Sequence, residues 1–211
     1  MNRFAQKEIE RPTPAGMIAI RSFCTPEEIQ SYCFDEQFGI HAQYKSIYTK
    51  RETLEKHAAK KDANVVLALK IPLQIVGFGV FSDPEPDERW AELGPGVMME
   101  IKAVEVSRTL RAFRIAGDLV RMMLDHPRIE RMIAYMVGYS WTWDLDGSEM
   151  TAQQYRNMLI RLFGPHGFVE LQTNEPNISL KPENLFMGRI GKDVPDSVRQ
   201  SFKWLRFGIS P

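Results

Sequence analysis

The stretch that most constrains the fold is residues 97–126, where a predicted strand passes through a basic turn directly into a predicted amphipathic helix. Residues 97–106 are mainly apolar or β-branched, which favours a buried strand. Beyond the turn, apolar side chains recur at three- and four-residue spacing, as on one helix face: Phe113, Ala116, Val120 and Met123. The strand and the helix are separated by only a few residues, among them Arg108, Arg111 and Arg114.

This turn is a predicted anion site. The first amides of a helix have no partner within the helix, and the helix dipole adds partial positive charge there. Three arginines around such a terminus indicate a ligand with several phosphates. The alternative is that Arg108 and Arg114 are solvated side chains at an ordinary helix start.

The turn resembles motif A of the GNAT superfamily of acyl-CoA-dependent N-acetyltransferases, Gln/Arg-x-x-Gly-x-Gly/Ala. Arg111 stands at the start of the motif, Arg114 in place of its first glycine, and Ala116 at its end. The resemblance implies acetyl-CoA as cosubstrate, with no metal. It also implies a set of cofactor-binding residues at the strand end and turn: Val104, Val106, Arg111, Ala112, Phe113, Arg114, Ile115, Ala116 and Gly117.

Further stretches resemble the acetoin-utilization acetyltransferase family over roughly residues 15–207. They are ERW at 88–90, IKAVEV at 101–106, YSWTWDLDG at 139–147, NEPNIS at 174–179 and RIGKDV at 189–194. Members of that family are taken to acetylate a lysine of AMP-forming acetyl-CoA synthetase and so to inactivate it. The resemblance therefore implies this synthetase as protein substrate and partner.

The fold expected is a mixed α/β GNAT fold, with a central, mostly antiparallel sheet, flanking helices and a splayed central pair of strands at 97–106 and 131–139. The chain length suggests a single domain over 15–211 with a C-terminal helical extension, after a flexible arm over 1–14. The other predicted strands are 16–23, then 64–70 and 74–82, which form a hairpin, and finally 167–173 and 185–190. The predicted helices run from Pro26 to about Cys33, over about 41–60, from Thr151 to Gly164, and from Pro195 onward.

The composition of the chain limits which binding partners and which cellular compartment we expect. With 27 basic and 27 acidic residues the formal net charge is zero, so no overall field favours nucleic acid or an anionic membrane. No apolar run approaches the roughly 20 residues of a membrane span, and the N-terminal residues lack the apolar run of a signal peptide. Cys24 and Cys33 bracket a predicted helix that would hold them about 13 Å apart, which excludes a disulfide. We therefore expect a cytoplasmic protein with reduced thiols, whose oligomeric state the sequence leaves open.

The histidines and cysteines give no metal-binding pattern. His41, His57, His126 and His166 are scattered without the spacing of metal ligands, and two cysteines nine residues apart make no zinc site. The residues therefore favour chemistry without a bound metal.

The chemistry requires a base, because a lysine with a pKa near 10.4 is about 4.6 kcal/mol from its reactive neutral form at pH 7. Glu100, eleven residues before Arg111, stands where many GNAT enzymes carry this base. The alternative is a strand carboxylate paired with a neighbouring cation. Alternation places Glu105 on the opposite face, unless a bulge interrupts the strand, and its role is left open.

Two departures from the GNAT pattern bear on the mechanism. Many GNAT enzymes protonate the leaving thiolate with a tyrosine four residues before a Gly-Phe pair, but before Gly167-Phe168 that position holds Phe163. Tyr139 is the candidate substitute, and a thiol pKa near 8.5 also makes the thiolate a tolerable leaving group. The second departure is Arg114, which either adds a phosphate contact or weakens cofactor binding.

Two segments are candidates for the partner-binding side. The acidic loop 83–96 carries Trp90, which either docks a partner or covers the core. In an extended segment 139–144, Tyr139, Trp141 and Trp143 would share one face, as core or as an exposed platform. The function expected is that of a protein lysine acetyltransferase. The alternatives are a degenerate acetyltransferase that regulates the synthetase by binding alone, and a small-molecule amine acetyltransferase.

Overall fold

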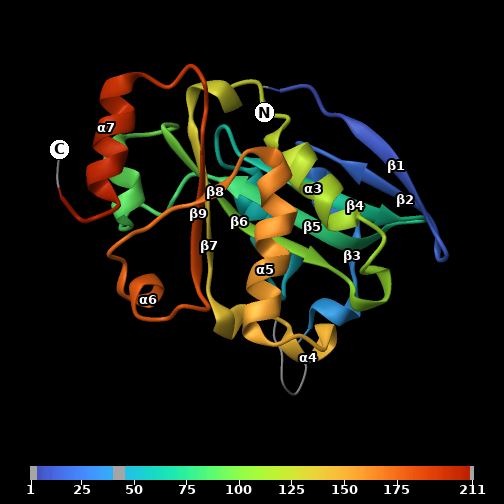
Figure 1. Ribbon diagram of the computed structural model, residues 1–211. Helices are drawn as coiled ribbons and strands as arrows, with labels where there is room; N and C mark the ends of the chain where they lie inside the picture. Colours follow the sequence, from blue (N-terminus) through green and yellow to red (C-terminus); the bar gives the residue numbers. More distant parts are fainter. Residues whose placement is uncertain (1–3, 40–45, 210–211) are drawn as a thin grey trace. The chain divides into compact units, whose positions relative to one another are not determined.

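The computed structural model describes residues 4–39 and 46–209 (Figure 1). The chain forms two compact units. Unit 1 is formed by residues 1–82 and 102–126, and unit 2 by residues 83–101 and 127–211. Strand β6 (Met98–Val106) belongs to both, because its first residues lie in unit 2 and its last in unit 1.

The sheet of unit 1 has the strand order β1-β2-β4-β5-β6. Its strands are β1 (Glu8–Thr13), β2 (Gly16–Arg21), β4 (Asn64–Lys70), β5 (Gln74–Ser82) and the end of β6. The ladders β1–β2, β2–β4 and β4–β5 are antiparallel, and the short β3 (Cys33–Phe34) pairs with β5 in parallel. The predicted hairpin of β4 and β5 is thereby confirmed.

Strand β1 corrects the expectation of a flexible arm over residues 1–14. It pairs with β2 from Glu8–Arg21 to Thr13–Gly16, so its backbone is held in a ladder. Gly16 allows the tight return between the strands because its φ of 107° is a conformation that side chains disfavour. Pro12 is tolerated because β1 is the first strand in the order, an edge where a missing N–H group breaks no ladder on the outer side.

The first two helices of unit 1 differ in how well local signals predicted them. Helix α1 (Pro26–Gln30) begins at the predicted capping box, in which the N–H of Glu28 donates to Thr25 Oγ1 (3.2 Å) and the N–H of Thr25 donates to Glu28 Oε2 (2.9 Å). Helix α2 (Arg51–Ala58) is shorter than the helix expected over 41–60. Residues 46–50 are not helical, because the chain enters α2 with extended backbone at Lys50, and residues 40–45 lie outside the described part of the chain.

A buried apolar cluster joins α1 and α2 to the sheet of unit 1. It includes Ile29 of α1, Leu54 of α2, Leu67 of β4 and Phe78 of β5, all with no exposed surface. Cys24 belongs to this cluster, and both it and Cys33 are free thiols. The helix expected to reach Cys33 ends at Gln30, and Cys33 lies in β3.

Helix α3 (Ile115–Leu124) packs against β2, β4 and β5 (Figure 1). It follows β6 and the 3₁₀ turn η3 (Arg108–Leu110), as the strand–turn–helix pattern predicted. Val120 and Met123 of the predicted apolar face are buried, together with Ile115, Leu119 and Met122. Phe113 and Ala116 are only half-buried, and Phe113 precedes the helix, which begins after Arg114.

The sheet of unit 2 has the strand order β6-β7-β9-β8. Its other strands are β7 (Ile133–Gly138), β9 (Leu185–Ile190) and β8 (Val169–Glu170). β6 and β7 are parallel, whereas the β7–β9 and β8–β9 ladders are antiparallel. β8 is much shorter than the strand expected over 167–173, because Gly167 still belongs to a turn with a φ of 84°. The ladders of the two units together form the mixed, mostly antiparallel sheet that was predicted.

Unit 2 contains two longer helices that local signals predicted. Helix α5 (Ala152–Phe163) starts at the capping box of Thr151 and Gln154, and α7 (Asp196–Leu205) is the C-terminal helix. The remaining helical segments are short: η2 (Arg89–Leu93), η4 (Ile129–Arg131), η5 (Ser140–Thr142), α4 (Leu145–Ser148), η6 (Gly164–His166) and α6 (Pro176–Ser179). Within the described ranges, no helix has the length and apolarity needed to cross a bilayer.

Two aromatic segments of unit 2 differ in exposure. Trp90 in η2 is 6% exposed and stacks on Phe186 with ring centroids 4.7 Å apart, so it covers the core of unit 2. The segment 139–144 is not extended as expected, because η5 turns it back on itself. Tyr139 therefore stacks on Trp141 at 4.7 Å, Trp143 stacks on Tyr155 at 5.1 Å, and Trp141 is 55% exposed.

Candidate active site

Strand β6 carries candidate residues in both units, and its alternation is interrupted. The carbonyl of Val97 accepts a hydrogen bond from the N–H of Ile133 at the start of β7, whereas the N–H of Ser107 donates to the carbonyl of Val76 on β5, both at 2.9 Å. In a regular strand, residues an even number apart direct their backbone groups to the same neighbour. A one-residue irregularity, or β-bulge, therefore lies between Val97 and Ser107. Burial nevertheless alternates from Met99 to Glu105, so the predicted placement of Glu105 on the face opposite Glu100 is confirmed.

The turn before α3 has the backbone of a glycine-rich loop without its glycines. Ala112 and Arg114 both adopt left-handed conformations, with φ of 69° and 63°. Each such residue costs about 1–2 kcal/mol when it is not glycine. Because the chain departs from helical geometry here, the first amides of α3, those of Ile115, Ala116 and Gly117, stand at a helix start with no capping side chain.

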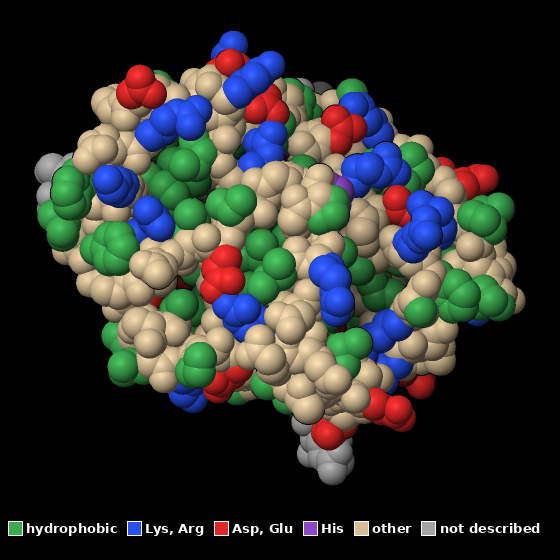
Figure 2. Space-filling model, in the orientation of Figure 1, with side chains coloured by type: hydrophobic (Ala, Val, Ile, Leu, Met, Phe, Trp, Pro, Cys, Tyr) green, Lys and Arg blue, Asp and Glu red, His purple; other side chains and the backbone are tan. Residues whose placement is uncertain are grey.

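The arginines of the turn are arranged differently from one another. Arg111 Nε donates to the carbonyl of Val106 at 3.3 Å, so this side chain ties the turn to the end of β6. Arg114 is exposed, and Arg108 is half-buried in η3. Figure 2 shows Lys and Arg side chains interspersed with Asp and Glu, which fits the equal numbers of the two signs. The predicted anion site in unit 1 would therefore depend on the local geometry of the turn.

Glu105 is buried in unit 1 and 7% exposed. Its Oε1 accepts a hydrogen bond from the backbone N–H of Ile47 at 3.2 Å. The carboxylate thus fixes the segment that leads into α2, a contact that the sequence pattern did not predict.

Glu100 lies in unit 2, opposite Tyr135 in the parallel ladder of β6 and β7. Ladder partners project side chains on the same face, so the half-buried carboxylate neighbours the buried phenol. Burial raises the pKa of Tyr135 far above its ordinary value, and the charges of Glu100 and Glu88 act in the same direction. Tyr135 therefore remains a hydrogen-bond donor, and its hydroxyl donates to Glu88 Oε2 at 3.4 Å.

Tyr139 follows β7 and is half-buried. Burial raises its pKa to about 12, and the charges of Glu175, Glu100 and Glu88 add to the effect. The side chain stacks on the exposed Trp141, whose ring also lies 4.8 Å from Lys181 Nζ. Tyr139 is thus a neutral phenol between several carboxylates and an aromatic surface.

The stretches ERW, YSWTWDLDG and NEPNIS come together in unit 2. Arg89 Nη1 donates to Asn174 Oδ1 at 2.5 Å, which joins the first stretch to the third. Glu175 belongs to NEPNIS, and its Oε2 is shielded from solvent without a hydrogen-bond partner among the described residues. Sequence reasoning missed Tyr135 and Glu175 as site residues, and it considered Glu88 only as part of the acidic loop 83–96. The signal available was that each of these glutamates lies within one of the family-like stretches.

The position of the usual GNAT general acid is occupied by a core residue. Phe163 is 1% exposed and packs against Phe168 with ring centroids 5.4 Å apart. No proton can come from this side chain. Among residues 4–39 and 46–209, no group of three or more His, Cys, Asp or Glu side chains is arranged to hold a metal ion.

The structure brings the predicted site residues together in two groups. Val104, Val106, Glu105 and the turn over 111–117 lie in unit 1, and Glu100 and Tyr139 lie in unit 2. Strand β6 carries residues of both groups. In unit 1 the uncapped amides at the start of α3 can bind an anion. In unit 2 a carboxylate such as that of Glu100 can accept a proton from an amine.

Comparison with known proteins relates the whole chain to acetoin utilization proteins. No protein-family model matches the chain. It is 29% identical to acetoin utilization protein AcuA of Bacillus licheniformis over 198 residues, which are 94% of this chain and 92% of that protein. AcuA of Bacillus subtilis is 28% identical over 195 residues, 92% of this chain and 91% of that protein. The crystal structure of an acetoin utilization protein from Exiguobacterium sibiricum matches with a TM-score of 0.86 at 27% identity, covering 98% of this chain and 97% of that one. These matches confirm the resemblance to the acetoin-utilization family.

Proposed function

We propose that this chain is an acetyl-CoA-dependent N-acetyltransferase of the GNAT type and that its acceptor is a lysine of a folded protein. The protein proposed is AMP-forming acetyl-CoA synthetase, which acetylation would inactivate. The observation that carries the proposal is the structural match of 0.86 over nearly the whole chain, because it includes the unit that holds Glu100 and Tyr139 as well as the cofactor turn.

Acetyl-CoA is proposed to bind along the end of β6 and at the start of α3. The left-handed backbone at Ala112 and Arg114 leaves the amides of 115–117 at the helix start, where they suit a pyrophosphate. Exposed Arg114 would add a charge-assisted contact to the phosphates. The backbone groups of Val104 and Val106 are proposed to hold the pantetheine arm, with the N–H groups also available to a tetrahedral oxyanion.

Glu100 is proposed as the general base. The acceptor ammonium must lose a proton before its nitrogen attacks the thioester carbonyl, and a carboxylate in direct contact or one water away can accept it. Glu88 and Glu175 surround the same part of unit 2 and would attract the ammonium before the proton leaves. The unpartnered Oε2 of Glu175 supports this role, because a shielded carboxylate oxygen gains most from an arriving N–H donor. We assign Glu105 a structural role, supported by its bond to Ile47.

The leaving thiolate is proposed to depart without a dedicated protein acid. Phe163 cannot donate a proton, and Tyr139, with a pKa of about 12, is a weak donor toward a thiolate whose own pKa is near 8.5. Tyr139 is therefore assigned to the wall of the acceptor site.

The acceptor protein is proposed to dock on the acidic loop 83–96 and on Trp141. Asp87 is exposed and would attract basic residues around a target lysine. Trp141, 55% exposed, is the aromatic available as an anchor, whereas Trp90 is buried and is not. Replacing Asp87 by Lys should slow association at low salt and leave acetyl-CoA affinity unchanged. The free thiols of Cys24 and Cys33 agree with a reducing compartment, so we place the protein in the cytoplasm.

The experiment that tests the proposal compares acceptors. Release of free CoA is followed with purified acetyl-CoA synthetase, with an unrelated folded protein rich in surface lysines, and with a small polyamine. The proposal predicts release with the synthetase alone. Release with the polyamine would favour the small-molecule alternative, and stable binding of the synthetase without release would favour the non-catalytic regulator.

A further inference from the structure

We propose that the N-terminal strand β1 takes part in acetyl-CoA binding, because Arg11 neutralises the buried carboxylate of Asp118 in the first turn of α3. The inference rests on the proposed function, in which the start of α3 binds the phosphates of the cofactor. It makes Arg11 a positioning residue: it acts on the cofactor through Asp118.

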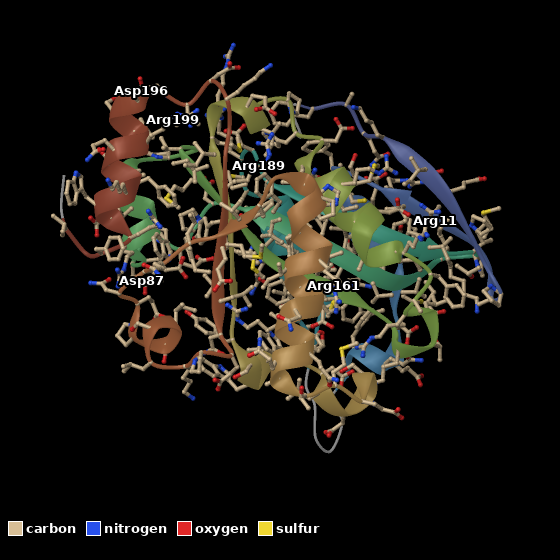
Figure 3. The ribbon with its side chains drawn as sticks, in the orientation of Figure 1. Arg11, Asp87, Arg161, Arg189, Asp196 and Arg199 are labelled. Atoms are coloured by element: carbon tan, nitrogen blue, oxygen red, sulfur yellow. The ribbon has the colours of Figure 1, made fainter. Side chains whose placement is uncertain are left out.

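The contact between Arg11 and Asp118 is close and shielded. Arg11 Nε and Nη2 both approach Asp118 Oδ2, at 2.7 and 2.5 Å, and Arg121 Nη2 donates to Asp118 Oδ1 at 3.1 Å. The side chain of Asp118 is only 8% exposed. Figure 3 labels Arg11 on β1, the strand that sequence analysis had assigned to a flexible arm.

Asp118 lies close to the amides that are proposed to bind phosphate, so its charge matters for cofactor binding. Asp118 lies three residues after Ile115, the first residue of α3, and its N–H donates to the carbonyl of Arg114 at 3.1 Å. One helical turn rises about 5.4 Å, so the carboxylate lies within a turn of the amides proposed to bind phosphate. A shielded negative charge at that distance would oppose a polyphosphate. Arg11 removes this opposition by pairing with the carboxylate of Asp118.

A second ion pair between the same two elements provides a matched control. Lys7, just before β1, lies 2.6 Å from Asp125 at the C-cap of α3. These side chains are 56% and 47% exposed, and the pair stands at the opposite end of the helix from the proposed phosphates. Loss of this pair would loosen the same strand from the same helix without uncovering a charge near the anion site.

The test measures acetyl-CoA binding by calorimetry, and steady-state kinetics with the acceptor, for four proteins. They are the natural chain, Arg11→Met, Lys7→Met and the double variant Arg11→Met/Asp118→Asn. Coupling between sites commonly amounts to about 5- to 150-fold in affinity, so Arg11→Met should weaken acetyl-CoA binding about fivefold or more. Its KM for acetyl-CoA should rise while kcat at saturation stays near that of the natural chain. Lys7→Met should bind within about twofold of the natural chain, because exposed pairs contribute little. The double variant should recover most of the loss, because the amide introduced by Asp118→Asn carries no charge.

Each other outcome is informative. Unchanged affinity in Arg11→Met would overturn the inference, as would an equal loss in Lys7→Met, which would show that attachment of the strand matters and the charge does not. A double variant as weak as Arg11→Met would also overturn it. Far-UV circular dichroism and the urea midpoint of every variant establish that the proteins compared are folded. If the natural chain itself binds no acetyl-CoA, the proposed function fails first, which is a different result from any of these.

Discussion

The hydroxyl of Tyr135 donates to Glu88 Oε2 across 3.4 Å, and the same tyrosine lies opposite Glu100 in the β6–β7 ladder. A buried phenol thus has a carboxylate as hydrogen-bond acceptor and a second carboxylate as its neighbour. Because the pKa of Tyr135 is raised, the phenol keeps its proton and orients Glu88 throughout the neutral range. In the proposed function the two glutamates have different roles: Glu100 would accept the proton, and Glu88 would attract the acceptor ammonium.

Replacing Glu100 by Gln should abolish most acetyl transfer and leave acetyl-CoA affinity within a few-fold. The substitution keeps the size of the side chain and removes the proton acceptor, and a general base contributes about a hundred- to ten-thousand-fold in rate. Single-turnover transfer, measured beside equilibrium binding of acetyl-CoA, checks both halves of the prediction. Transfer at the natural rate across neutral pH would make Glu100 structural.

Replacing Glu88 by Gln should weaken binding of the acceptor and leave the affinity for acetyl-CoA unchanged. Glutamine still accepts the hydrogen bond of Tyr135, so only the charge is lost. A hydrogen bond to a charged group contributes about 1.5 kcal/mol or more, and KM for the acceptor should therefore rise about tenfold with a smaller change in kcat. Glu92→Gln is the control, because Glu92 is an exposed glutamate on the same short helix η2. Equal effects of the two substitutions would reduce the role of Glu88 to a general contribution to surface charge.

The pH dependence of the reaction should show no contribution from Tyr139 below about pH 11. A raised pKa favours the protonated form, so with a pKa of about 12 the phenol stays neutral across the range in which enzymes of this kind are assayed. The rate should increase with pH as the acceptor amine loses its proton, without a falling limb between pH 8 and 10. Tyr139→Phe should lower kcat less than about tenfold. A falling limb in the natural protein that disappears in Tyr139→Phe would identify Tyr139 as the general acid after all.

Glycine substitutions at the two left-handed positions should separate backbone strain from charge. Ala112→Gly and Arg114→Gly each relieve a positive φ, so each should raise the free energy of unfolding by about 1 kcal/mol in urea titrations. Only the second removes a cation. If Arg114 contacts phosphate, Arg114→Gly should bind acetyl-CoA about fivefold more weakly than Ala112→Gly. Equal affinities would mean that the side chain of Arg114 points to solvent and that its backbone alone matters.

Short-range sequence patterns predicted the helix starts, the hairpin and the strand–turn–helix, which depend on neighbouring residues. The capping boxes at Thr25 and Thr151 and the hairpin of β4 and β5 appear where short-range patterns placed them. The strand–turn–helix around Arg111 also appears as expected, since turn, dipole and apolar periodicity are properties of adjacent residues. These are the elements for which a single sequence carries enough information.

The features that the sequence did not predict depend on contacts between residues far apart in the chain. Strand β1 is held by its antiparallel pairing with β2 and by the hydrogen bond from Arg11 to Asp118, 107 residues later in the chain. The neighbourhood of Glu88, Glu100 and Tyr135 depends on the register of a parallel ladder, which no short window encodes. Side chains that meet through such long-range pairing cannot be assigned from spacing alone.

The most direct test of the central claim is mass spectrometry of purified AMP-forming acetyl-CoA synthetase after incubation with this protein and acetyl-CoA. Peptide mapping locates any added acetyl group, and the Glu100→Gln variant serves as the matched negative control. The account predicts one acetyl group on one lysine of the synthetase, formed by the natural chain and not by the variant, together with loss of synthetase activity. A synthetase of unchanged mass, with or without a stable complex, would contradict it.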